Sequence, residues 1–159
     1  MHNENPRHEA LAGFPLILEV PLHWGDMDSY GHVNNLLYLR WCETGRVDYF
    51  LKIGFWPELP PKGLGPILAS ITCDFRRPLT YPDSVWIGTR VSRIGNSSLQ
   101  MDHVVVSRDL GVVAAEVKST LVMLDYSVMK SVRVPDEMRN AIARVEARCG
   151  PVPAARSTP

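Results

Sequence analysis

The feature that most constrains the fold is a helical stretch from about Asn35 to Ile53 that is apolar on more than one side. One stripe at helical spacing contains Tyr38, Cys42, Gly45, Tyr49 and Ile53, and a second flank contains Leu36, Leu39, Val47, Phe50 and Leu51. This pattern predicts a buried helix with another element wrapped around it. A glycine in mid-helix, such as Gly45, costs about 1 kcal/mol of helix stability relative to Ala. A compensating benefit is expected, and the absence of a side chain would allow another backbone to approach closely.

Almost everything around this helix has the pattern of β-strands. Residues 14–24 predict a first strand, and the Pro/Gly-rich run PELPPKGLGP ends the helix. Apolar and polar residues then alternate cleanly from Ile67 to Arg76. Further strands are predicted at 85–94, 99–107 and 112–124, followed by a possible short helix at 135–148.

One strand, a long helix and four strands in mostly antiparallel succession indicate an α+β fold. The expected architecture is a hotdog fold, in which a curved antiparallel five-stranded sheet wraps around one long central helix. A single sheet covers that helix on one side only. The remaining apolar helix surface therefore predicts a homo-oligomer, a dimer or a tetramer.

The bulk properties limit the class of protein. The 159 residues fit one domain, expected at 14–148 between flexible segments at 1–13 and 149–159. Lys plus Arg and Asp plus Glu both number 17, which argues against a nucleic-acid binder that relies on bulk positive charge. No signal-peptide pattern or membrane-spanning run is present, so we expect a cytoplasmic protein. The three cysteines show no CxxC pair, and no histidine has metal-ligand spacing.

The segment WGDMDSYGHVNNLLYL lies where the first strand hands over to the buried helix. A helix N-terminus has backbone N–H groups without intrahelical partners, and its dipole favours nearby negative charge. Asp28, Gly31 and the start signal Asn34-Asn35 would place a carboxylate beside such donors. This arrangement can stabilise an oxyanion that forms on a substrate carbonyl. Asp28 taken alone could equally be a turn or helix-capping residue.

The stretch HWGDMDSYGHVNNLLYLRWCETGRVDYF resembles the 4-hydroxybenzoyl-CoA thioesterase-like family. The later DFRRPLTYPDSVWI is similar to that family's approach to its third strand, and the resemblance extends over nearly all of residues 15–140. It implies hydrolysis of an acyl-CoA thioester to a free acid and CoA, without a metal or an organic cofactor.

The resemblance also implies roles for individual residues. Asp28 matches the family's nucleophile or general base, and the carbonyl-polarising backbone N–H falls on Asn35. His32 and Asn34 occupy the HVNN positions typical of members that act on fatty acyl groups, which favours an aliphatic substrate. We expect His32 to orient a neighbour rather than to act as a base, Asn34 to contact substrate or cap the helix, and Asp26 to hold the turn.

Other candidates rest on residue type alone. Arg76, Arg77, Arg90 and Arg93 could meet the phosphates of CoA, because guanidinium groups match phosphate geometry. Trp56 and the loop 57–66 are the best candidates for shaping the acyl end of the site. Glu43 would form a helix-surface salt bridge with Arg40 or Arg46.

Two alternatives to thioester hydrolysis stay open at this point. A hydratase or dehydratase on the same fold needs a paired histidine and acid, for which His32 and Glu43 are the candidates. A non-catalytic acyl-CoA-binding protein could also use this fold, because a fold does not determine a function.

Overall fold

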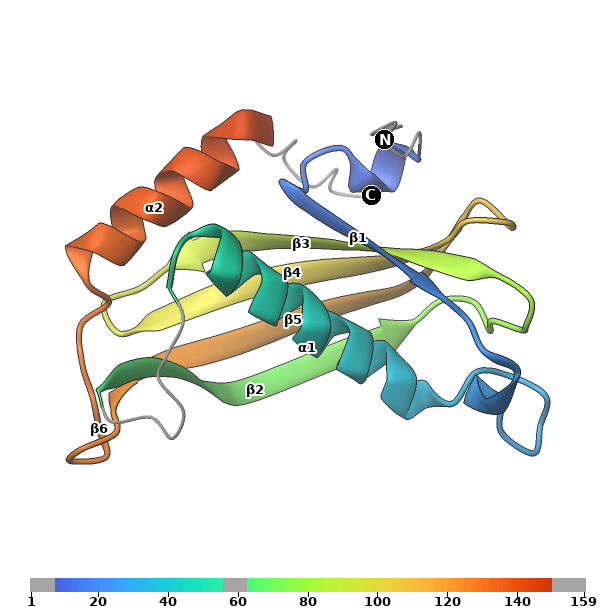
Figure 1. Ribbon diagram of the computed structural model, residues 1–159, viewed down its shortest axis with the longest axis horizontal. Coiled ribbons are helices and arrows are strands. Elements are labelled where there is room, and N and C mark those ends of the chain that lie inside the picture. Colours follow the sequence, from blue (N-terminus) through green and yellow to red (C-terminus); the bar gives the residue numbers. More distant parts are fainter. Residues whose placement is uncertain (1–7, 56–62, 150–159) are drawn as a thin grey trace, which may run out of the picture.

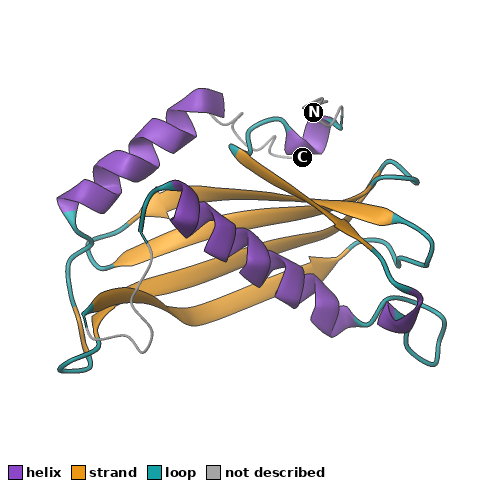
Figure 2. Ribbon diagram, viewed as in Figure 1, coloured by secondary structure: helices purple, strands orange, loops and turns teal. Residues whose placement is uncertain are grey.

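The computed structural model describes residues 8–55 and 63–149. Figures 1 and 2 show one long helix, α1, lying across a strongly twisted sheet. The strands are β1 (Leu16–Pro21), β2 (Leu64–Phe75), β3 (Ser84–Ile94), β4 (Ser98–Ser107), β5 (Val112–Asp125) and β6 (Lys130–Ser131). The helices are α1 (Asn35–Lys52) and α2 (Asp136–Glu146), with short 3-10 turns η1 (Glu9–Leu11), η2 (Trp24–Asp26) and η3 (Ala147–Cys149). No helix in the described ranges is long and apolar enough to cross a membrane.

The sheet confirms the predicted architecture with three differences. Its strands are antiparallel in the order β1-β3-β4-β5-β2, so β2 pairs with β5 at the far edge rather than with its chain neighbour β3. The two-residue β6 adds a sixth strand beside β5. A register shift between Leu68 and Ser70 breaks the alternation predicted for β2, because a bulge places two residues opposite one.

Helix α1 packs on the inner face of the sheet, mainly against β3 and β1. Tyr38, Cys42, Gly45 and Tyr49 of the predicted stripe are all buried. On the second flank, Leu36 and Leu51 are 64% and 54% exposed, because one sheet covers only one side of the helix. These two positions therefore lack the burial that the sequence pattern predicts.

The opposite, outer face of the sheet has a smaller apolar cluster, built around Val104 and Val106. Leu11 in η1 packs there with only 3% of its surface exposed. Part of the segment expected to be a flexible arm therefore belongs to the packed structure. Residues 1–7 and 150–159 lie outside the described residues.

Three polar side chains on neighbouring strands form a row across the inner face, beneath α1. Thr89 on β3 lies directly opposite His103 on β4, and the Thr89 hydroxyl is hydrogen-bonded to His103 Nδ1 at 3.0 Å. Ser119 on β5 lies 3.3 Å from His103 Nε2. All three side chains are buried, and this polar row lies between two apolar clusters, one around Tyr49 and one around Cys42.

The polar row predicts a specific loss of stability in mild acid. Burial, reinforced by the charge of Arg46, lowers the pKa of His103 from 6.5 to about 3. His103 is harder to protonate in the folded state than in the unfolded state. Its neutral form therefore contributes fully to the free energy of unfolding above pH 6.5, and this contribution declines as the pH falls toward 3. Between pH 7.5 and 5.5 the free energy of unfolding should fall by about 1.4 kcal/mol from this group.

Urea unfolding at the two pH values measures this change, and His103→Gln should remove most of it. The exposed His32 provides a matched control, since His32→Gln should keep the wild-type pH dependence. An equal pH dependence in His103→Gln and wild type would show that His103 is not the titrating group.

Candidate active site

The loop before α1 is a tight, internally bonded turn. An isolated bridge joins Met27 to Val33, and the Asp28 N–H donates to the His32 carbonyl at 2.8 Å. The Gly31 N–H donates a hydrogen bond to the Asp28 carbonyl at 3.0 Å. Gly31 has φ +77°, a conformation that glycine adopts without penalty. The loop thus fixes the backbone of Asp28 relative to the start of the helix.

The Asp28 side chain combines a turn role with an available oxygen. Its Oδ1 accepts the Tyr30 N–H at 2.8 Å, the local bond that an aspartate in a turn makes. Its Oδ2 has no hydrogen-bond partner within the described ranges, and the residue is exposed. The bond to Tyr30 holds the carboxylate in place while one oxygen stays open to a reactant.

The backbone N–H of Asn35 at the start of α1 is an uncommitted donor. Asn34 caps the helix, because its Oδ1 accepts the Leu36 N–H at 3.0 Å and its carbonyl accepts the Leu37 N–H at 3.0 Å. The Asn35 N–H has no hydrogen-bond partner in the part of the chain that the structure describes. It is therefore available to a substrate carbonyl, whereas the Asn34 side chain, predicted as substrate-binding, is engaged in capping.

A hollow of about 290 Å³ opens beside this helix start. It brings together four of the predicted site residues from two distant segments, namely His32, Asn35, Arg76 and Arg77. Its apolar wall consists of Val33, Tyr38, Phe75 and Pro78. Asp28 and Asn34 lie in the adjoining loop and do not line it.

Tyr38 and Phe75 line the wall of this hollow, although no sequence pattern indicated a functional role for either residue. Their rings meet edge to face with centroids 5.2 Å apart, so they join α1 to the end of β2. Burial raises the pKa of Tyr38 to about 12, which keeps its phenol neutral. Tyr38 has the spacing of a core residue, and only the sheet topology reveals that it borders the hollow.

The predicted phosphate-binding arginines fall into separate places. Arg76 is already bonded to Glu116 at 2.9 Å, whereas Arg77 lines the hollow without a described ion-pair partner. Arg90 pairs with Asp102 at 3.0 Å. Arg93 borders a different depression, with Gly95, Ser98, Gln100 and Thr120. Within one chain, Arg77 is thus the best placed of the four.

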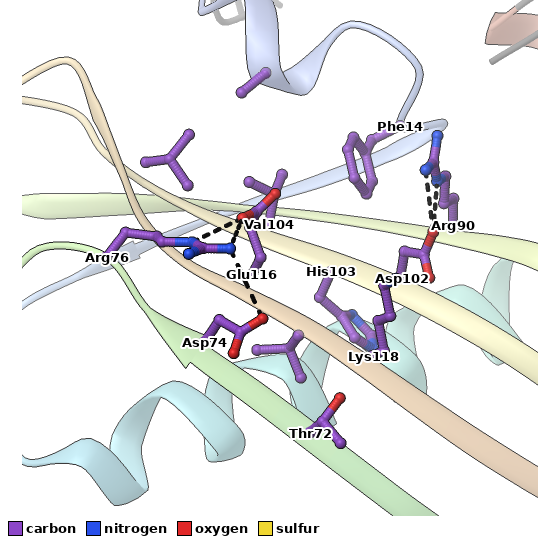
Figure 3. Close-up of a pocket in the computed structure, with 13 residues that line it drawn as sticks. Phe14, Thr72, Asp74, Arg76, Arg90, Asp102, His103, Val104, Glu116 and Lys118 are labelled. Atoms are coloured by element: carbon purple, nitrogen blue, oxygen red, sulfur yellow. Dashed lines mark hydrogen bonds and ion pairs between the residues drawn. The ribbon is translucent and has the colours of Figure 1, made fainter. Parts of the chain in front are cut away.

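A larger hollow of about 460 Å³ lies on the outer face of the sheet (Figure 3). Its cations are mostly neutralised, since Arg76 bonds Glu116 and Arg90 bonds Asp102 while stacking 4.8 Å from the Phe14 ring centre. No residue of the loop 27–34 lines it. This outer hollow is therefore separate from the Asp28 loop, although Arg76 lines both the outer hollow and the hollow at the start of α1.

The remaining sequence predictions have mixed outcomes. The Asp26 carboxylate accepts the His23 N–H at 2.7 Å, which matches its expected structural role. Glu43 makes no ion pair with Arg40 or Arg46 in the described structure, and it borders a different hollow from His32. Trp56 and residues 57–62 of the predicted acyl-end loop lie outside the described residues.

Comparison with known proteins identifies the family of this chain. The family model described as "Thioesterase-like superfamily" matches residues 22–142. The long-chain acyl-CoA thioesterase FadM of Escherichia coli is 24% identical over 119 residues, covering 75% of this chain and 90% of FadM. An acyl-acyl carrier protein thioesterase of Arabidopsis thaliana, ATL3, is 27% identical over 116 residues, covering 72% of this chain and 60% of that protein.

Solved structures show the same fold. A Thermus thermophilus thioesterase complexed with coenzyme A and Zn superposes with a TM-score of 0.75 at 33% identity, covering 88% of this chain and 98% of that one. A putative thioesterase from Pseudomonas aeruginosa gives a TM-score of 0.73 at 32% identity, and the match covers 81% of this chain and 98% of that one. The narrower resemblance to the 4-hydroxybenzoyl-CoA group stays a prediction. The curled sheet, the central helix and the family match together establish that this chain is a thioester hydrolase of the Thioesterase-like superfamily.

Proposed function

We propose that the chain hydrolyses an acyl-CoA thioester to a free carboxylic acid and CoA at the start of α1. The observation that carries this proposal is an Asn35 N–H without a described partner at the start of α1, with an open oxygen of Asp28 in the loop that leads into it, both inside a segment matched by the family model. The similarity to FadM and to the coenzyme A complex supports CoA as the leaving group.

The proposed chemistry uses the loop and the helix terminus together. Asp28 either attacks the thioester carbonyl or removes a proton from an attacking water. The developing oxyanion is stabilised by the Asn35 N–H, and one such donor is worth about 2.7–4 kcal/mol in the barrier. The CoA thiolate then leaves and takes up a proton, and His32 orients neighbouring groups. In the nucleophilic route, water next hydrolyses the acyl–Asp28 anhydride, which releases the free acid and restores the carboxylate. This scheme invokes no metal or organic cofactor.

For this reaction, the bound substrate must contact both the Asp28 carboxylate and the hollow at the start of α1. Asp28 does not line the hollow, but its N–H is bonded to the carbonyl of His32, which does. The substrate carbonyl would therefore sit at the border between the loop and the hollow. Arg77 is then positioned to meet a phosphate of CoA, with Arg76 and Arg93 as weaker candidates.

We propose an aliphatic rather than an aromatic acyl group. The support is the HVNN segment containing His32 and Asn34, together with the similarity to a long-chain thioesterase. The similarity to ATL3 makes an acyl-carrier-protein thioester a second form of the same substrate. A cytoplasmic location, as the sequence predicts, fits either substrate.

A homodimer or homotetramer is part of the same proposal. The edge strand β2 exposes Leu64, Ile67, Leu68 and Phe75, each at least 40% accessible. Leu36 and Leu51 of α1 are exposed as well. Unpaired backbone groups and apolar side chains along one edge favour pairing with a second copy.

The alternative hydratase chemistry is disfavoured by position. It needs His32 and Glu43 in one site, but His32 borders the hollow at the start of α1 and Glu43 borders another hollow toward its end. A single chain does not bring this acid and base together.

The test is a panel of acyl-CoAs of increasing chain length, with released thiol followed by a thiol reagent. We expect turnover that is higher for aliphatic than for benzoyl-type esters, with kcat in the ordinary range of about 1–10³ s⁻¹. Tight binding across the panel without thiol release would identify a non-catalytic acyl-CoA-binding protein. Hydration of an enoyl-CoA without thiol release would favour the hydratase chemistry.

A further inference from the structure

Arg46 is a buried cation that the described structure leaves unsatisfied. Only 7% of its surface is exposed, yet its Nη1 has no hydrogen-bond partner among residues 8–55 and 63–149. Within the described ranges, no carboxylate comes within 4 Å of its guanidinium. A buried group without a partner keeps its full desolvation cost, and the cost is greater for a charge. Arg46 therefore needs an acceptor that residues 8–55 and 63–149 do not supply.

The surroundings of Arg46 indicate where that acceptor would enter. Arg46 borders a hollow of about 220 Å³ between α1 and the edge strand β2. The other lining residues are mostly apolar, namely Val47, Phe50, Pro66, Leu68 and Leu121, with Glu43 at the border. A mainly apolar hollow with one unsatisfied cation suits a ligand that is apolar along its length and anionic at its end.

This hollow and the candidate active site lie on one line of the helix. Asn35, Leu39, Cys42 and Arg46 follow at i, i+4, i+7 and i+11, which places them on the same side of α1. Phe75 at one end of β2 borders the first hollow, and Leu68 nearer its start borders the second. Long side chains on a helix lean toward its N-terminus, so a guanidinium at this position is expected about 10–16 Å along the axis from the Asn35 N–H.

We propose that the acyl chain of the substrate runs along the α1–β2 seam and that Arg46 binds a carboxylate at its far end. The preferred substrate would then be a monothioester of CoA with a dicarboxylic acid of about 8 to 12 carbons, since this length spans the distance from Asn35. This inference rests on the proposed function, because the thioester carbonyl is placed at Asn35. The terminal carboxylate of the substrate would accept hydrogen bonds from the Arg46 guanidinium. This ion pair would favour carboxylate-ended substrates over methyl-ended ones.

Two competing partners for Arg46 can be separated by experiment. Glu43 borders the same hollow one turn earlier and could swing toward the guanidinium. A second copy of the chain could also place a carboxylate there across the exposed β2 edge. Either partner would neutralise Arg46 and remove the selection for a carboxylate-ended substrate.

The decisive measurement compares kcat/KM for carboxylate-ended and methyl-ended acyl-CoAs of equal length. Wild type should favour the carboxylate-ended ester, and Arg46→Met should lower the ratio of the two kcat/KM values by about 10–100-fold. Arg46→Lys should restore part of the ratio, whereas Arg40→Met, at an exposed position on the same helix, should leave it unchanged. Glu43→Gln should also keep the preference.

An unchanged ratio in Arg46→Met would overturn the inference. A preference that is absent in wild type and appears only in Glu43→Gln would also overturn it, because Glu43 would then be the partner of Arg46. A smaller oligomer in Arg46→Met, with the Arg40→Met oligomer unchanged, would assign Arg46 to a second copy instead. If wild type hydrolyses neither ester, the proposed function fails, and calorimetric binding of the two esters decides the role of Arg46 separately. Arg46-dependent preference in binding would support the inference, and equal binding would refute it.

Discussion

Replacing Asp28 with asparagine is expected to lower kcat for acyl-CoA hydrolysis by about 10²–10⁴-fold, the contribution of a positioned general base. Asparagine keeps an oxygen that can accept the Tyr30 N–H, so the loop should keep its shape. It cannot take up a proton from water or form a covalent acyl intermediate. We therefore expect KM to change little and the loss to fall on kcat.

Asp125 provides the matched control for this substitution. Its Oδ1 accepts the Ser127 N–H at 2.9 Å, the same two-residue turn that Asp28 makes with Tyr30. Asp125→Asn should therefore retain wild-type turnover. Activity of Asp28→Asn within a few-fold of wild type would show that Asp28 is a turn residue only. If activity is lost, hydroxylamine trapping of an acyl group on Asp28 in the wild type would distinguish a nucleophile from a general base.

Gly45→Ala is expected to lower the free energy of unfolding by about 1–3 kcal/mol, the usual cost of overpacking a core. A Cβ at this position would clash with the Thr89 hydroxyl. Thr89 is fully buried, stiff about χ1 and hydrogen-bonded to His103, so moving it would break the polar row. Helix propensity favours alanine by about 1 kcal/mol, which is smaller than the expected combined cost of the clash and the lost hydrogen bond.

Chemical denaturation measures this balance directly. Thr44→Ala, next to Gly45 but exposed, should change stability by less than about 0.5 kcal/mol. The double variant Gly45→Ala/Thr89→Ala should be more stable than the sum of the two single changes indicates, because the clash is removed. A Gly45→Ala protein more stable than wild type would mean that α1 shifts away from β3 at little cost.

The sequence predicted the elements well because their signals are local. Hydrophobic spacing indicated α1 within a residue of its observed end, and the turn residues around Asn34 marked its start. The Asp28 loop was identifiable for the same reason, since the turn, the cap and the helix start all lie within ten residues. The bulge in β2 and the burial of Leu11 escaped prediction, because both depend on the partners that the chain finds in three dimensions.

The sequence by itself determined the fold class and the position of the central helix, and it placed the candidate carboxylate Asp28 just before that helix. The tertiary structure decided which distant residues join that site, because the pairing of β2 with β5 rather than β3 brings Phe75 and Arg77 to the start of α1. It also decided that Arg46, which looks like an ordinary helix-surface arginine in the sequence, is buried with its Nη1 unbonded to any described residue. Burial and unsatisfied charge arise from packing between segments, so no local pattern encodes them.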